Sequence, residues 1–204
     1  MLFSDTYKVP ATIGEGLFKD KGSKFMAFVY PIKNEEEVKM YLQQLKKEHF
    51  SAAHHCYGYV LGFDKQIQKS NDDREPSNTA GKPILRSILA KDLTNTLVVV
   101  VRYFGGKLLG VPGLIQAYGE AAADALNSIP IVEKIITEKH ELRFDYSHEN
   151  EAFKIIKQFS LKILQHHHAE EITIIFEVRK SQAEAVLHAI KEKRIFETTF
   201  LGEQ

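Results

Sequence analysis

Three carboxylates flank one arginine about a third of the way along the chain. Asp72, Asp73 and Glu75 flank Arg74 in the polar stretch SNDDREPSN. Clustered carboxylates can bind a hard divalent cation or act as a general base, and they can equally pair with an arginine and cap the N–H groups of a loop. The spacing is not that of an EF-hand loop. We therefore expect pairing with Arg102 and N–H capping here, and no metal.

An arginine and a glycine-rich turn follow an apolar run in the stretch VVVVRYFGGKLLGVPG. On a strand, Arg102 would share one face with Val98 and Val100, and Tyr103 would lie on the other face. The glycines allow unusual backbone conformations, and a helix starting after the turn would favour an anion. No GK[ST] follows, so this is not a P-loop. Ligand contact and a purely structural turn both remain open. The candidate contact residues of this stretch are Arg102, Tyr103, Gly105, Gly106, Lys107, Gly110 and Gly113.

Histidines next to the single cysteine resemble a metal-binding motif only superficially. Adjacent strand residues point to opposite faces, so only His54 and Cys56 would share one, with His55 on the other. Zinc would need further ligands, and a catalytic Cys–His pair lacks a recognisable setting. We expect a structural or partner-contact role. The HHH run at 166–168 is interpreted as a solvated loop tip that could bind nickel resin adventitiously. No catalytic residue, metal or cofactor is assigned.

Apolar periodicity predicts an α+β arrangement for the first part of the chain. Asn34 followed by Glu37 is typical of a capping-box helix start, and Thr79 is the expected N-cap of a second helix. Pro112 would lie in the first turn of a third helix, where a missing N–H costs little. Helices are expected at 34–49, 79–89 and 112–127, and strands at 24–32, 54–61 and 96–104.

The remainder of the chain has its own pattern. Strands are expected at 142–146, 161–165, 171–179 and 195–201, and helices at 152–159 and 183–190. This β-α-β-β-α-β order is the ferredoxin-like arrangement, with both helices on one face of a four-stranded sheet. We therefore expect two domains, 1–130 and 136–204.

Composition is that of an ordinary soluble globular protein, with 44% apolar and 26% charged residues. No run approaches the roughly 20 apolar residues that cross a bilayer, and the start does not resemble a signal peptide. The single cysteine excludes an intrachain disulfide and suggests a reducing compartment, so a cytoplasmic location is expected. Because 27 basic residues balance 27 acidic ones, a nucleic-acid partner would have to be held by a local patch.

The stretches SKFMAFVYPI, AHHCYGYVLG, DDREPSNTAGKPIL and LVVVVRYFGGKLLGVPGLIQAYGEAA, in this order, resemble the IMPACT/YigZ family. The resemblance covers essentially the whole chain, and the last two stretches are the specific ones. It implies an N-terminal domain like the second domain of the small-subunit ribosomal protein S-five. It also implies a C-terminal ferredoxin-like domain similar to the fifth domain of elongation factor G.

Several positions depart from the family pattern. The family usually has D-D-G-E-P-x-G-T-A-G, where this chain has Arg74 and Asn78 in place of two glycines. In the second motif, GG-x-K-L-G-x-G-G-L, Lys107 is shifted by one place. Leu108 stands at the usual lysine, Pro112 replaces a glycine, and Gln116 stands where a basic residue is common. These changes remove or relocate cations that a phosphate would contact.

The resemblance implies a non-enzymatic, translation-associated regulator that contacts RNA, the ribosome or a translation-regulating protein, as eukaryotic relatives regulate translation through a protein partner. Besides the turn residues named above, the candidate contact residues are Asp72, Asp73, Glu75, Thr79, Gly81, Lys82 and Arg86. One alternative is an enzyme acting on a phosphorylated small molecule, with a loop carboxylate as base or metal ligand. Another is a protein-interaction module that binds no nucleic acid. We expect no membrane partner and favour a monomer.

Overall fold

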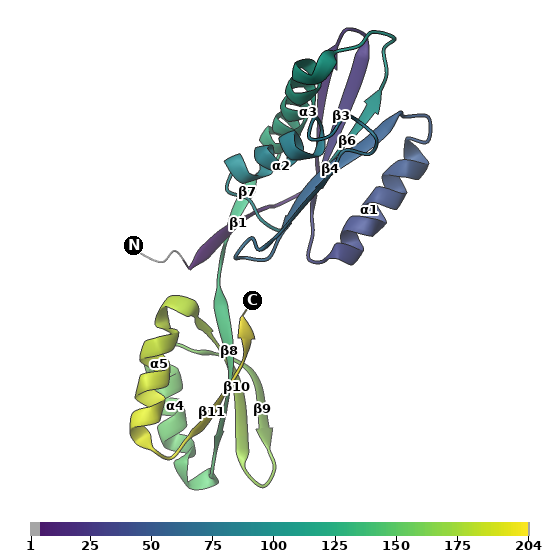
Figure 1. Ribbon diagram of the computed structural model, residues 1–204. Helices are drawn as coiled ribbons and strands as arrows, with labels where there is room; N and C mark the ends of the chain where they lie inside the picture. Colours follow the sequence, from purple (N-terminus) through teal and green to yellow (C-terminus); the bar gives the residue numbers. More distant parts are fainter. Residues whose placement is uncertain (1–4, 204) are drawn as a thin grey trace. The chain divides into compact units, whose positions relative to one another are not determined.

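The computed structural model describes residues 5–203 and contains two compact units (Figure 1). The N-terminal unit comprises residues 7–134, and the C-terminal unit comprises residues 135–203 together with Asp5 and Thr6. Asp5 belongs to the C-terminal unit because its carboxylate accepts hydrogen bonds from Nε and Nη2 of Arg179 at 2.5 and 2.8 Å. The expected two-domain α+β fold is confirmed. β1 (Thr6–Pro10) and β7 (Ile131–Ile135) form a separate two-stranded sheet.

The N-terminal unit is built on a five-stranded antiparallel sheet with the order β2-β3-β6-β4-β5. Its strands are β2 (Gly14–Asp20), β3 (Ser23–Pro31), β4 (His54–Leu61), β5 (Ile67–Asn71) and β6 (Thr96–Tyr103). β6 lies at the centre, and its residues from Thr96 to Arg102 are buried, as expected for a strand covered on both faces. Arg102 therefore lies at the end of the central strand of the sheet.

Helices cover both faces of this sheet (Figure 1). α1 (Glu35–Glu48) packs with Val38 and Leu45 against the face that carries Val99 and Val101. α2 (Gly81–Ala90) and α3 (Gly110–Asn127) pack on the opposite face, in a core that includes Val98 and Val100. The side chains of the four valines thus alternate between two cores, because successive side chains of a strand point to opposite faces.

Helix starts agree with the sequence in α1 and differ in α2. The side chain of Asn34 accepts a hydrogen bond from the backbone N–H of Glu37 at 2.9 Å, which confirms it as an N-cap. The prediction that Thr79 caps α2 is wrong, because its hydroxyl donates to the carbonyl oxygen of Pro76 at 2.7 Å. The carboxylate of Asp72 instead accepts the first N–H groups of α2 from across the loop.

The C-terminal unit has the predicted ferredoxin-like topology. Its elements are β8 (Thr137–Phe144), the short 3-10 helix η1 (Tyr146–His148), α4 (Glu149–Gln158), β9 (Lys162–His168), β10 (Ile172–Arg179), α5 (Lys180–Lys193) and β11 (Glu197–Glu203). The antiparallel sheet has the order β11-β8-β10-β9, and both helices lie on one face of it (Figure 1). Ile172, Ile174, Phe176 and Val178 alternate along β10 and are all buried in the core with α4 and α5.

The expectation that residues 166–168 form a solvated loop tip is wrong. They are the last residues of β9, and His166 and His168 pair with Ile174 and Ile172 of β10. Their side chains are nevertheless exposed, because β9 is an edge strand. Among residues 5–203, no helix combines the length and apolar character needed to span a membrane.

Candidate functional site

A buried ion pair lies at the end of the central strand. Nη1 of Arg102 donates to Oε1 of Glu75 at 2.5 Å, and their side chains are 6% and 4% exposed. The same oxygen accepts a hydrogen bond from the hydroxyl of Tyr118 at 2.8 Å. The guanidinium also lies 5.3 and 5.5 Å from the ring centres of Phe25 and Phe104. The expected pairing of Arg102 with the acidic loop is therefore present, and it ties that loop to the sheet.

The two aspartates of the loop are also engaged internally. Oδ1 of Asp72 accepts hydrogen bonds from the backbone N–H groups of Ala80 and Gly81 at 3.0 and 2.8 Å. This places a negative charge at the start of α2, where the helix dipole favours it. Oδ2 of Asp73 accepts the backbone N–H of His55 at 2.7 Å. The loop carboxylates therefore cap backbone N–H groups, which is the structural role that the sequence offered as an alternative to metal binding and base catalysis.

The thiol and the imidazole beneath this loop are poorly suited to nucleophilic chemistry. Sγ of Cys56 donates to the carbonyl oxygen of Asp72 at 3.0 Å and lies 3.4 Å from the hydroxyl of Tyr118. Burial raises the pKa of the Cys56 thiol and of the Tyr118 hydroxyl, so both stay protonated at neutral pH. Burial also lowers the pKa of His55, which favours its neutral form. His55 lies on the opposite face of the sheet from Cys56, and Nδ1 of His54, which shares the face of Cys56, donates to the carbonyl oxygen of Asp73 at 2.8 Å, so neither histidine is placed to activate the thiol.

The turn between β6 and α3 presents apolar side chains to solvent. Phe104 is 52% exposed, Leu108 84% and Val111 53%. Lys107 is exposed beside them. No side chain caps α3 and its first turn contains no acidic residue, so its N-terminal N–H groups keep their attraction for an anion. Phe104, Leu108 and Val111 were not among the candidate contact residues, because apolar side chains are most often buried and nothing local in the sequence marks these as exposed.

The structure brings the acidic loop, the start of α2 and the turn to one end of the sheet. Asp72 holds the start of α2, and Glu75 holds the same loop against Arg102 at the end of β6. The candidate contact residues differ in exposure. The buried ones are Glu75, Thr79, Gly81 and Arg102, the half-buried ones are Asp72, Asp73, Tyr103 and Gly113, and the exposed ones are Lys82, Arg86, Gly105, Gly106, Lys107 and Gly110. We call the exposed side chains Lys82, Arg86, Phe104, Lys107, Leu108 and Val111 the turn surface.

Two positions where the family pattern has glycine carry a left-handed backbone here. Arg74 has φ of 70° and Asn78 has φ of 65°. Glycine reaches this region without steric cost, whereas an ordinary side chain is penalised and asparagine tolerates it better. The two departures noted in the sequence therefore place side chains at positions of positive φ, and both side chains lie on the exterior of the loop.

Arg74→Gly is expected to raise the free energy of unfolding by about 0.5–1 kcal/mol, because relief of the left-handed penalty exceeds glycine's extra unfolded-state entropy. Chemical denaturation of the full chain measures this. Arg74→Ala is the matched control, since alanine keeps the backbone penalty and should give no gain. Equal stabilisation by alanine would assign the effect to the arginine side chain instead.

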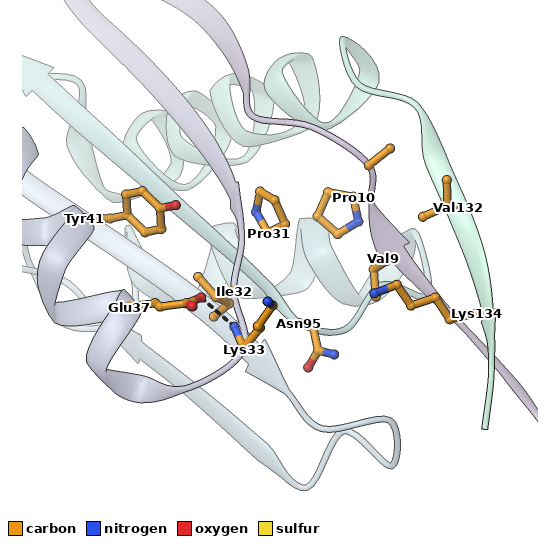
Figure 2. Close-up of a pocket in the computed structure, with 11 residues that line it drawn as sticks. Val9, Pro10, Pro31, Ile32, Lys33, Glu37, Tyr41, Asn95, Val132 and Lys134 are labelled. Atoms are coloured by element: carbon orange, nitrogen blue, oxygen red, sulfur yellow. Dashed lines mark hydrogen bonds between the residues drawn. The ribbon is translucent and has the colours of Figure 1, made fainter. Parts of the chain in front are cut away.

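A pocket of about 490 Å³ lies elsewhere in the N-terminal unit, between β1, β7 and the start of α1 (Figure 2). None of the candidate contact residues lines it. Its carboxylate, Glu37, accepts the backbone N–H of Lys33 at 2.8 Å, and Tyr41 stacks on Tyr30 with ring centres 4.0 Å apart. The lining is mainly proline and aliphatic, and it places no base next to a nucleophile among the described residues.

Fold and site together define a two-domain α+β protein with a ferredoxin-like second domain and an exposed turn surface on the first. The protein-family model of the Impact N-terminal domain matches residues 21–126 of this chain. The chain is 34% identical over 163 residues to the IMPACT family member YvyE of Bacillus subtilis, covering 80% of this chain and 75% of that protein. It is 34% identical over 139 residues to the IMPACT family member YigZ of Escherichia coli, covering 67% of each. This chain belongs to the IMPACT family.

A solved structure has the same fold over nearly the whole chain. The crystal structure of a hypothetical protein superposes with a TM-score of 0.73 at 25% sequence identity. The alignment covers 98% of this chain and 99% of the other. The two-domain fold is therefore common to this chain and to that solved protein.

Proposed function

We propose that this protein is a non-enzymatic regulator associated with translation, and that its N-terminal unit contacts RNA, the ribosome or a translation-regulating protein through the turn surface. The observation that carries the proposal is the division of roles at this end of the sheet. The loop carboxylates are engaged in internal contacts, while cations and apolar side chains face solvent. The translational setting, and with it a cytoplasmic location, rests on what the family resemblance implies.

Electrostatics support an RNA contact. Lys82 and Arg86 are four residues apart on α2 and both are exposed, so they lie on one helix face. Lys107 adds a third cation on the turn. Neutralising about three phosphates would weaken association roughly 20- to 40-fold between about 50 and 200 mM salt.

Exposed apolar side chains favour a second candidate function, a protein-interaction module that binds no nucleic acid. Leu108 and Val111 are 84% and 53% exposed and lie three residues apart where α3 begins. Apolar side chains clustered on an exposed surface commonly mark protein contacts. Binding of this kind would change little with salt, because it depends on apolar area rather than on charge.

Co-sedimentation of the purified full chain with ribosomes and with total RNA, across a salt series, tests both candidates. Lys82→Glu/Arg86→Glu is expected to reduce RNA or ribosome association at least about tenfold, because it turns two phosphate contacts into repulsions. Lys39→Glu/Lys47→Glu is the matched control. It makes the same charge change on exposed positions of α1, which covers the opposite face of the sheet.

The outcomes of this experiment distinguish nucleic-acid contact from a protein-interaction module. Salt-sensitive association that is lost in the α2 variant and kept in the α1 variant supports nucleic-acid contact through the turn surface. Salt-insensitive association with ribosomes that is lost in Leu108→Ser supports the protein-interaction module. No association with ribosomes or RNA at low salt contradicts the RNA and ribosome forms of the proposal.

A further inference from the structure

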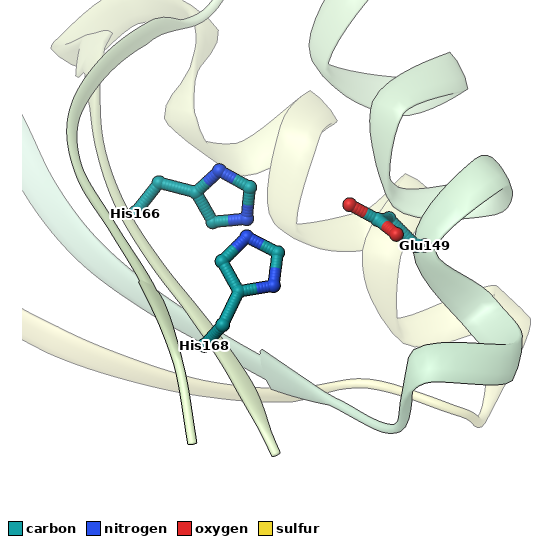
Figure 3. A group of neighbouring side chains, drawn as sticks. All are labelled: Glu149, His166 and His168. Atoms are coloured by element: carbon teal, nitrogen blue, oxygen red, sulfur yellow. The ribbon is translucent and has the colours of Figure 1, made fainter. Parts of the chain in front are cut away.

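The C-terminal unit brings together three side chains that can ligate a metal (Figure 3). Glu149, His166 and His168 each offer one ligand atom, and these atoms all lie within 4.8 Å of one another. Figure 3 shows the two imidazoles next to each other on one strand, with the carboxylate extending toward them from the neighbouring helix. None of these residues belongs to the turn surface of the N-terminal unit.

Strand register explains why the two histidines converge. His166 and His168 pair with Ile174 and Ile172, whose side chains are buried against the helices. Because paired residues of antiparallel strands point to the same side, both imidazoles lie on the helix-covered side of the sheet. His167 points to the opposite side. Glu149 is the first residue of α4, so the edge strand and the helix start meet at this point.

Neighbouring aromatic rings hold both imidazoles in place. The ring centres of His166 and His168 are 4.2 Å apart. Phe153 packs edge-on against His166 at 5.7 Å, and Tyr146 lies 6.1 Å from His168. The hydroxyl of Tyr146 in turn donates to the carbonyl oxygen of Ala169 at 2.8 Å. In the part of the chain that the structure describes, no hydrogen bond or ion pair engages the ligand atoms of Glu149, His166 or His168.

We propose that Glu149, His166 and His168 form a binding site for a divalent transition-metal ion of the zinc class. Two imidazole nitrogens and one carboxylate oxygen are ligands that zinc prefers, whereas calcium and magnesium require mostly oxygen ligands. Ligand atoms about 2.0–2.1 Å from the ion would lie roughly 3.3 Å apart in tetrahedral geometry. Small rotations of the exposed imidazoles and of the half-buried carboxylate would close the present separations. Three protein ligands leave one coordination position for water.

Metal binding at this site would cross-link the edge strand β9 to the start of α4. Both elements belong to the C-terminal unit, so the ion would stabilise that unit without involving the N-terminal contact surface. A ligand that binds only the folded state raises the melting temperature in proportion to the logarithm of its concentration above Kd. Zinc should therefore raise the melting temperature of the full chain, and a chelator should reverse the effect.

Isothermal titration of zinc chloride into the chelator-treated, tag-free full chain tests the proposal. We expect saturable binding of one zinc ion per chain at this site. His166→Ala, His168→Ala and Glu149→Gln should each weaken this binding at least about tenfold, since even outer-shell changes have effects of 10–100-fold. His167→Ala is the matched control, and it should leave the affinity within about a factor of two because its side chain faces the other side of the sheet.

Imidazole nitrogen chemical shifts provide a second readout that depends on the ligands themselves. Zinc should shift the ring signals of His166 and His168 and leave those of His167 in place. Thermal melts in chelator check that each variant is folded. The proposal is overturned if the wild-type chain binds no zinc, if His166→Ala/His168→Ala retains the wild-type affinity, or if His167→Ala weakens binding as much as its neighbours do.

Discussion

Glu75→Gln is expected to lower the free energy of unfolding by roughly 3–5 kcal/mol, the usual effect of removing one partner from a buried ion pair. The substitution keeps the side-chain volume and removes the charge, so Arg102 is left as an uncompensated buried cation. The effect is large because, among residues 5–203, Nε of Arg102 already has no hydrogen-bond partner. Urea denaturation of the full chain, followed by circular dichroism, measures the change.

Two further variants isolate the ion pair as the cause. Glu120→Gln makes the same chemical change at an exposed position of α3 and should alter stability by less than about 0.5 kcal/mol. Glu75→Gln/Arg102→Met also removes the unpaired cation, so it should recover part of the loss. Arg102→Met alone completes the comparison. If the double variant loses as much stability as Glu75→Gln and Arg102→Met together, Arg102 and Glu75 are not energetically coupled.

Most of the strands and helices that the sequence predicted have a buried apolar face, although β9 and β11 were also predicted and most of their residues are exposed. β3, β4, β6 and α3 were recognisable because their apolar residues follow the period of a strand or a helix. β5 was missed because every residue of IQKSN is exposed, so no apolar alternation marks it. β7 is likewise exposed throughout, and β2 contains two glycines that weaken a strand pattern. Pairing with a neighbouring strand, which no local pattern records, determines these elements.

The ion pair at the site was predictable, but the helix cap was not. A buried arginine at a strand end needs a carboxylate, and the sequence offers three in one loop. The choice of Asp72 as the cap of α2 depends on how the loop folds back, with Asp73 and Arg74 in conformations with positive φ. Local spacing favoured Thr79 instead. The Glu149 cluster was missed for a similar reason, because it depends on strand register between β9 and β10.

Scaffold and contact surface are physically coupled at the turn that follows Arg102. Phe104 packs on the buried guanidinium with one side and is half-exposed on the other. The backbone N–H of Gly105 donates to the hydroxyl of Ser23 at 3.1 Å, which fixes the turn against the β2–β3 hairpin. A change inside this contact should therefore move exposed side chains as well as lower stability.

Gly105→Ala is accordingly expected to lower the free energy of unfolding by roughly 2–3 kcal/mol, within the usual range for overpacking a closely packed position. A methyl group at Gly105 would lie 1.9 Å from the carbonyl carbon of Gly22 and 2.2 Å from the backbone nitrogen of Ser23. These are backbone atoms, so the clash is relieved only if the turn shifts away from the hairpin. Thermal and urea denaturation measure the loss.

Gly106→Ala is the matched control for Gly105→Ala, because a methyl group at Gly106 would meet nothing within 4 Å. Gly106 has φ of 84°, so alanine there should cost only about 1–2 kcal/mol through its backbone conformation. If the turn surface binds a partner, the shift at Gly105 should also weaken co-sedimentation under conditions where the variant is fully folded, because it displaces Phe104 and Lys107. Equal stability losses in the two variants would contradict the close backbone contact as the cause.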